Sequence, residues 1–135
     1  MIAIRGVEHI GIRVTDASRS EGFYRLFGFE VTFRGGPEPV VVMRNERGVE
    51  INLIVNANQG PTPANLLMDV PDKHPGYTHV ALGVESIEET VAELGRLGIT
   101  ITGGPTKLGD RRSLFVRDPD RNVIELRETA PASAR

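Results

Sequence analysis

The sequence predicts an α+β fold of two tandem βαβββ modules, each a curled four-stranded mixed sheet with a helix on one face. Residues 7–14 (VEHIGIRV) and 77–84 (YTHVALGV) share one alternation of apolar and polar residues, with a histidine at the same position. The same shift along the chain places GFEVT of residues 28–32 over GITIT of residues 98–102. A repeated unit of about seventy residues indicates a duplicated module. We expect the two modules to pair into a half-open barrel.

The chain length fits one domain of ordinary size. We therefore expect a single domain over residues 1–135 that consists of module one (5–55), a connection (56–76), module two (77–128) and a tail (129–135). The connection is rich in Asn, Pro, Gly and Asp, which favours a long loop between modules.

Module one begins with a strand whose two faces differ. Ile10, Ile12 and Val14 share its apolar face, and His9, Gly11 and Arg13 share the other. The helix that follows is capped by Thr15 or Asp16 and ends at Gly28, and strands are predicted at 29–33, 40–43 and 49–55.

Module two repeats this order. Ser86 begins a helix that runs to Leu97 and ends at Gly98. Strands are predicted at 99–102, 112–117 and 122–127, with a turn at 118–121 and a loop at 103–111 that holds five extra residues.

Composition narrows the possible functions. The chain has 16 basic and 18 acidic residues and no cysteine, which disfavours nucleic acid as a partner and excludes thiolate chemistry. The first residues form no long apolar run, so we expect no signal peptide or membrane span and a cytoplasmic protein.

Four polar side chains suggest a metal site on the faces opposite the helices. His9 and His79 occupy equivalent first strands, and Glu50 and Glu125 occupy equivalent last strands, where VEI lies over IEL. Two imidazoles and two carboxylates suit an octahedral divalent ion with positions left open for substrate. An alternative is that Glu50 forms an ion pair with Arg13.

Five fragments in order, EHIGIRV, FYRLFGFEV, GVEINLI, GYTHVAL and DPDRNVIEL, resemble the module signatures of the vicinal oxygen chelate superfamily. This superfamily includes glyoxalase I, extradiol dioxygenases, methylmalonyl-CoA epimerase and the bleomycin and fosfomycin resistance proteins. The resemblance covers nearly all of residues 5 to 128 and implies metal ligands at His9, Glu50, His79 and Glu125.

The resemblance is closest to glyoxalase-like members, which implies a divalent-metal-dependent enzyme of lactoylglutathione lyase type. Proton transfer would pass through a metal-stabilised enediolate of a small oxygenated substrate, with Glu125 as base and Glu50 as its counterpart. The two nitrogen and two oxygen donors suit nickel, cobalt, zinc, manganese or iron.

Three further residues are predicted to contact substrate. Arg13 matches a glyoxalase position that contacts a glutathione carboxylate, whereas Ile54 replaces an asparagine of that family and Asn52 lies nearer to Glu50. Phe115 stands where extradiol dioxygenases have a tyrosine, which favours a role in lining the cavity.

Two alternative functions stay open in the sequence. One is a bleomycin-resistance-type protein that sequesters a ligand, and the other is an extradiol dioxygenase or epimerase of the same superfamily. We expect a homodimer, because exposed half-barrels need a partner, and the modules can pair within one chain or between two.

Overall fold

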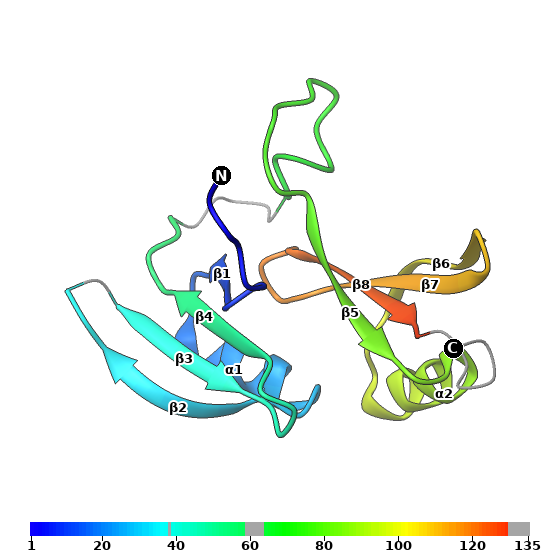
Figure 1. Cartoon of the computed structure of the whole chain (residues 1–135), viewed down its shortest axis with the longest axis horizontal. Coiled ribbons are helices and arrows are strands. Elements are labelled where there is room, and N and C mark those ends of the chain that lie inside the picture. The colour runs from blue at the N-terminus through cyan, green and yellow to red at the C-terminus, as the bar shows by residue number, and fades with distance from the viewer. Residues whose placement is uncertain (38, 59–63, 130–135) are drawn as a thin grey trace. The chain divides into compact units, whose positions relative to one another are not determined.

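The computed structural model describes residues 1–37, 39–58 and 64–129, and it divides the chain into two compact units, Met1–Thr62 and Pro63–Arg135. Each unit contains one four-stranded mixed sheet and one helix, which confirms the predicted duplication (Figure 1). The unit boundary falls inside the predicted connection 56–76. Most of the predicted tail lies outside the described residues.

Unit one has the predicted βαβββ order. Its strands pair in the order β1-β4-β3-β2, with β1 parallel to β4 and the other pairs antiparallel. The elements are β1 (Ile10–Arg13), α1 (Ala17–Arg25), β2 (Glu30–Gly35), β3 (Val40–Arg44) and β4 (Glu50–Ile54).

Local sequence explains these boundaries. The side chain of Asp16 accepts a hydrogen bond from the backbone nitrogen of Arg19 at 2.8 Å and so caps α1. The helix ends at Arg25, slightly earlier than predicted, and a turn leads to Gly28, whose φ of 87° suits glycine. The apolar face of the sheet packs into a core of Val14, Tyr24, Phe29, Val41, Met43, Ile51 and Leu53.

Unit two repeats the arrangement, with strand order β5-β8-β7-β6 and β5 parallel to β8. The elements are β5 (His79–Val84), α2 (Ile87–Leu97), β6 (Ile101–Leu108), β7 (Arg111–Arg117) and β8 (Val123–Glu128). Ser86 caps α2 and Gly98 ends it with a φ of 72°, both as predicted. The core of this unit contains Ile87, Leu94, Leu114, Val116, Ile124 and Leu126.

The second strand of module two, β6, is longer than the sequence predicted. Most of the predicted loop 103–111 is part of β6, which continues to Leu108 and pairs with β7 through two register shifts. These register shifts accommodate the extra residues while the pairing of β6 with β7 continues. Gly104 allows the close approach, because a Cβ there would lie 2.7 Å from the carbonyl oxygen of Ser113.

Residues 65–69 of the connection are hydrogen-bonded to strand β7 and to the turn that follows it. The two terminal guanidinium nitrogens of Arg117, Nη1 and Nη2, each donate to an oxygen of the Asp69 carboxylate at 2.9 Å. Asn65 donates through its side chain to the carbonyl oxygen of Arg121 at 3.3 Å. The hydrogen bonds from Arg117 lower the pKa of Asp69 to about 2. Residues 65–69 therefore belong to unit two as an ordered segment.

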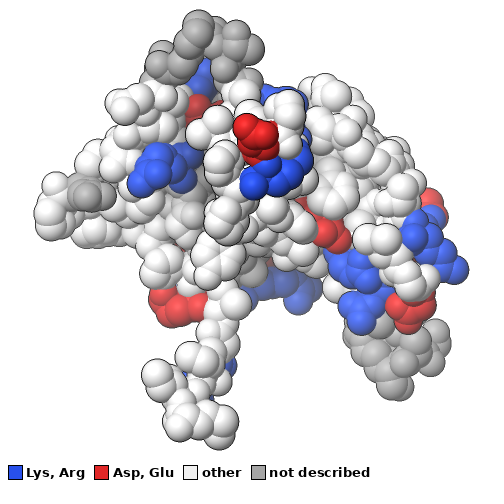
Figure 2. Space-filling view, turned by 90° about the horizontal axis from the view of Figure 1, so that it is seen from above, with Lys and Arg blue, Asp and Glu red and all other residues white. Residues whose placement is uncertain are grey.

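The described surface carries mixed charge. Arg112 donates to Glu88 at 2.5 Å and to Glu128 at 3.0 Å, and its hydrogen bond to Glu88 lowers the pKa of Glu88 to about 2. On the face in Figure 2, basic and acidic side chains often adjoin one another. In the described part of the chain, no helix is long and apolar enough to cross a membrane.

Candidate metal centre

In unit two, the structure brings two predicted ligands into direct contact. His79 begins β5, and Glu125 lies in the middle of the neighbouring strand β8. The His79 Nε2 atom lies 3.0 Å from the Glu125 Oε1 atom. Glu125 is only 7% exposed, whereas a third of the His79 side chain is accessible to solvent. One imidazole and one carboxylate therefore share a partly open position on this sheet.

Two neighbours constrain the ring of His79. Thr78 Oγ1 lies 2.8 Å from Nδ1, and the ring of Phe115 meets the imidazole edge to face with centroids 5.7 Å apart. Phe115 pairs with Glu125 across the β7–β8 ladder, so it lies beside both donors. That Phe115 lines a substrate cavity stays a prediction.

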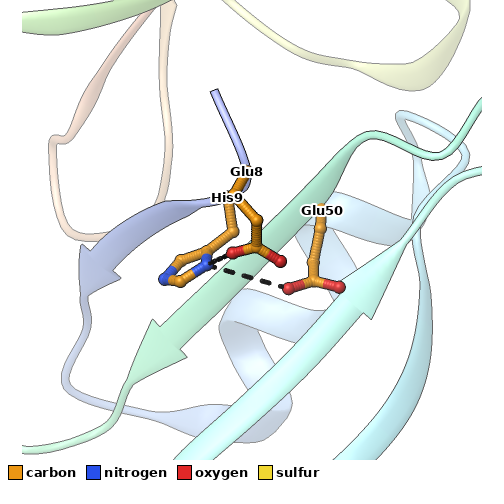
Figure 3. A group of neighbouring side chains, drawn as sticks. All are labelled: Glu8, His9 and Glu50. Carbon is orange, nitrogen blue, oxygen red and sulfur yellow. Dashed lines mark hydrogen bonds and ion pairs between the residues drawn. The ribbon is translucent and has the colours of Figure 1, made fainter. Parts of the chain in front are cut away.

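In unit one, His9 and Glu50 lie near each other but less closely (Figure 3). His9 Nδ1 is 4.0 Å from Glu50 Oε2 and also contacts the carboxylate of Glu8. Ligand atoms of these three residues all lie within 4.8 Å of one another, a spacing that can hold a metal ion. Glu50 also has Arg44 as a neighbour at 3.9 Å.

Glu8 was missed by the sequence reasoning. Strict alternation assigns adjacent residues of a strand to opposite faces, but β1 begins only at Ile10. Glu8 and His9 precede that strand, so alternation does not govern their side chains.

The ladder register gives Glu125 a different counterpart from the one that the sequence shift indicated. In unit two, Glu125 pairs with Ala81, which lies two residues after His79. In unit one, the residue two positions after His9 is Gly11, and it pairs with Asn52. Asn52 and Glu125 therefore occupy equivalent positions, while Glu50 lies two residues earlier on the same face.

Asn52 also has an unsatisfied oxygen. Its Oδ1 atom is buried and has no hydrogen-bond partner among the described residues. Burying a polar atom without a partner costs free energy, so such atoms often mark the place of a ligand. Asn52 is thus a candidate oxygen donor beside His9.

Arg13 has a hydrogen-bond partner at the end of the neighbouring strand. Its Nε donates to Asn56 Oδ1 at 3.0 Å, and Asn56 follows β4 by two residues. The guanidinium is thereby oriented at the end of β1. Asn56 was not recognised in the sequence, because it follows the last strand of module one.

The structure thus places one histidine beside one predicted carboxylate within each module. That all four predicted ligands hold a single ion stays a prediction, as do the catalytic roles of Glu50 and Glu125.

Comparisons with known proteins agree with the fold and the module signatures. Residues 6–126 match the Glyoxalase/Bleomycin resistance protein/Dioxygenase superfamily. The crystal structure of a glyoxylase/bleomycin resistance protein/dioxygenase domain from Frankia sp. EAN1pec is similar, with a TM-score of 0.76 and 22% sequence identity. That similarity covers 95% of this chain and 100% of the other, and it shows the fold.

Two curated relatives are similar in sequence. Glyoxalase domain-containing protein RDO1 from Mycosarcoma maydis is 26% identical over 93% of this chain and 69% of its own length. A probable lactoylglutathione lyase from Vibrio parahaemolyticus is 38% identical, but the match covers 43% of this chain and 44% of the relative. The lyase similarity therefore spans less than half of either protein.

Proposed function

Because the chain belongs to the glyoxalase/bleomycin resistance protein/dioxygenase superfamily, we propose that it is a divalent-metal-dependent enzyme of glyoxalase type. Its reaction would be a proton transfer on a small oxygenated substrate, of the kind that a lactoylglutathione lyase catalyses. The partial match to a probable lactoylglutathione lyase supports this activity among those of the superfamily.

The observation that carries the proposal is the contact of His79 with Glu125. An imidazole nitrogen and a carboxylate oxygen 3.0 Å apart form two adjacent donors of the types that first-row divalent metals accept. The unsatisfied Oδ1 of Asn52 is a candidate oxygen donor on the equivalent strand of module one. The residues present therefore fit a divalent ion.

We propose that His9 and an oxygen donor of module one complete the ligand set with His79 and Glu125. The ladder register favours Asn52 for this oxygen, and Glu50 is the donor that the sequence predicts. When bound, the ion would stabilise negative charge that develops on a substrate oxygen.

Other residues of the chain would transfer the proton, exclude water and bind the substrate. Glu125 is buried and fixed, so it is suited to accept a proton from the substrate and return it at a neighbouring atom. Phe115 covers one side of the His79 ring and would exclude water from that side. Arg13, oriented by Asn56, offers a cation for a substrate carboxylate.

The test begins with metal content. Protein purified without chelator should contain one divalent ion per chain, and His79→Ala should lose most of it. His74→Ala is the matched control, since His74 is exposed and lies outside both candidate pairs. Metal-loaded protein should then isomerise the adduct of methylglyoxal and glutathione.

Other experimental outcomes would indicate a different activity within the superfamily. Oxygen uptake with a catechol would indicate a dioxygenase, and exchange of a substrate proton without isomerisation would indicate an epimerase. Protein that takes up no metal but binds a ligand would contradict the proposal in favour of sequestration.

A further inference from the structure

A buried serine lies next to the carboxylate of Glu125. Ser113 is in β7, is 0% exposed, and pairs with Arg127 across the β7–β8 ladder. Its hydroxyl donates to Glu125 Oε2 at 2.6 Å. A hydroxyl bound to a carboxylate at this distance is a strong, charge-assisted hydrogen bond.

Arg127 fixes the direction of that hydrogen bond. Its Nη1 donates to Ser113 Oγ at 3.2 Å, and its Nη2 donates to the carbonyl oxygen of Leu108 at 3.2 Å. A guanidinium has donors but no acceptor. The serine oxygen must therefore accept from Arg127, and its only hydrogen is left for Glu125.

The consequence is that the two oxygens of Glu125 have different surroundings. Oε2 accepts from Ser113 and lies 3.8 Å from Arg127 Nη1, whereas Oε1 faces His79 Nε2 at 3.0 Å. A carboxylate fixed at one oxygen cannot rotate freely, so the other oxygen keeps its position beside the imidazole. Less conformational entropy is then lost when Oε1 takes a ligand.

Module one does not repeat this support. The ladder positions equivalent to Ser113 and Arg127 are Val40 and Ile54, which pair with each other across β3 and β4. Neither apolar side chain can orient Asn52 by a hydrogen bond. The supported carboxylate is therefore a special feature of module two.

We propose that Ser113 and Arg127 are positioning residues, which hold the carboxylate of Glu125 so that Oε1 is ready to bind the metal ion. This inference rests on the proposed function and adds to it two residues outside the ligand set. It also explains how the hydroxyl of Ser113 can be buried at little cost in free energy, because the hydroxyl both donates and accepts a hydrogen bond.

The experiment compares two buried serines. Ser113→Ala removes the hydrogen bond to Glu125, and Ser20→Ala is the matched control, because Ser20 is also 0% exposed and its hydroxyl has no partner among the described residues. Titration of metal-free protein with cobalt(II) by calorimetry should show roughly 10- to 100-fold weaker binding for Ser113→Ala and unchanged binding for Ser20→Ala.

Two spectroscopic readouts separate positioning from general damage to the fold. The visible absorption of bound cobalt(II) should change in Ser113→Ala, because the geometry of its ligands changes. In metal-free protein, the ring ¹⁵N signals of His79 should shift in Ser113→Ala and stay in place in Ser20→Ala. Arg127→Met, at a partly exposed position, removes both the donor to Ser113 and the cation 3.8 Å from Glu125 Oε2. It should change both readouts in the same direction, and it is the variant to use if Ser113→Ala does not fold.

The results distinguish the two levels of the proposal. Wild-type protein that binds no cobalt(II) contradicts the proposed function, and the role of Ser113 is then rejected with it. Wild-type, Ser113→Ala and Arg127→Met proteins that bind cobalt(II) equally leave the proposed function in place and overturn only the positioning role.

Discussion

At the scale of single residues, the two candidate donor pairs are unequal. His79 and Glu125 are in hydrogen-bonding contact, and Glu125 is supported from behind by Ser113. His9 and Glu50 are 4.0 Å apart and more open to solvent. A general base must be held within reach of the proton that it abstracts, so the better fixed Glu125 is the better candidate for proton transfer.

Replacing Glu125 should separate chemistry from folding. Glu125→Gln keeps the shape and an oxygen for Ser113, so the thermal midpoint should change little. Turnover of the methylglyoxal–glutathione adduct should fall by about 10²- to 10⁴-fold, because the amide cannot accept the proton. Glu46→Gln, in an exposed turn, is the control, and full activity of Glu125→Gln would remove the role.

The module-one oxygen donor can be identified by two substitutions. Asn52→Leu removes the buried oxygen with little change of volume and should weaken cobalt(II) binding by more than ~10-fold. Glu50→Gln should leave cobalt(II) binding close to that of wild type. The reverse result, measured by the same calorimetry, would assign the donor to Glu50 as the sequence shift indicated.

At the scale of elements, β6 shows how an irregular strand shapes the site. Its register shifts lie at residues 101–106, opposite the part of β7 that carries Ser113 and Phe115. Bulges increase local twist and redirect side chains, and they are frequent beside active sites. The close approach at Gly104 thus helps to set the backbone from which Ser113 reaches Glu125.

Gly104→Ala should destabilise unit two. The added Cβ would meet the Ser113 carbonyl oxygen at 2.7 Å, in addition to the cost of a φ of 75°. Gly109→Ala is the control, because Gly109 has a similar φ of 66° and no described atom within 4 Å of an added Cβ. Left-handed backbone alone costs about 1–2 kcal/mol, so urea unfolding should show a larger loss for Gly104→Ala. Equal losses would mean that β6 moves away without cost.

The segment of residues 65–69 gives a pH-dependent contribution to stability. The folded-state pKa of Asp69, about 2, lies below the ordinary 3.8, so its ionised form stabilises the fold above pH 3.8. This stabilisation is lost as the pH falls through about 2. Asp69→Asn should therefore lower the thermal midpoint at pH 7, and the difference from wild type should vanish near pH 2. Asp72→Asn, three residues beyond Asp69, is the control and should leave the thermal midpoint close to that of wild type at both pH values.

At the scale of the whole molecule, several apolar side chains remain uncovered. Ile2, Ile4 and Val7 are 85%, 80% and 85% exposed, and Tyr77 is 98% exposed. Large apolar side chains exposed to this degree are common on surfaces that another chain covers. We therefore propose a homodimer, as the sequence also predicts.

Sedimentation analysis should give twice the chain mass at micromolar concentration. A combined substitution of Ile2, Ile4 and Val7 by serine should shift the protein toward monomer, since the apolar area available to the partner decreases. Leu108→Ser is the control, because Leu108 is an exposed apolar residue far from these three in the sequence. A monomeric mass for the wild type would contradict the dimer.

The duplicated βαβββ modules and the helix caps at Asp16 and Ser86 could be predicted from the sequence alone. These features depend on alternation and on local hydrogen bonds, which short stretches of sequence encode. Three features became visible only in the folded chain: the extension of β6 through the predicted loop, the register that places Asn52 at the position equivalent to Glu125, and the hydrogen bond from Ser113 to the carboxylate. Register and cross-strand contacts arise from residues far apart in the chain, and a shift of two residues leaves the alternation unchanged, so no local pattern could reveal it.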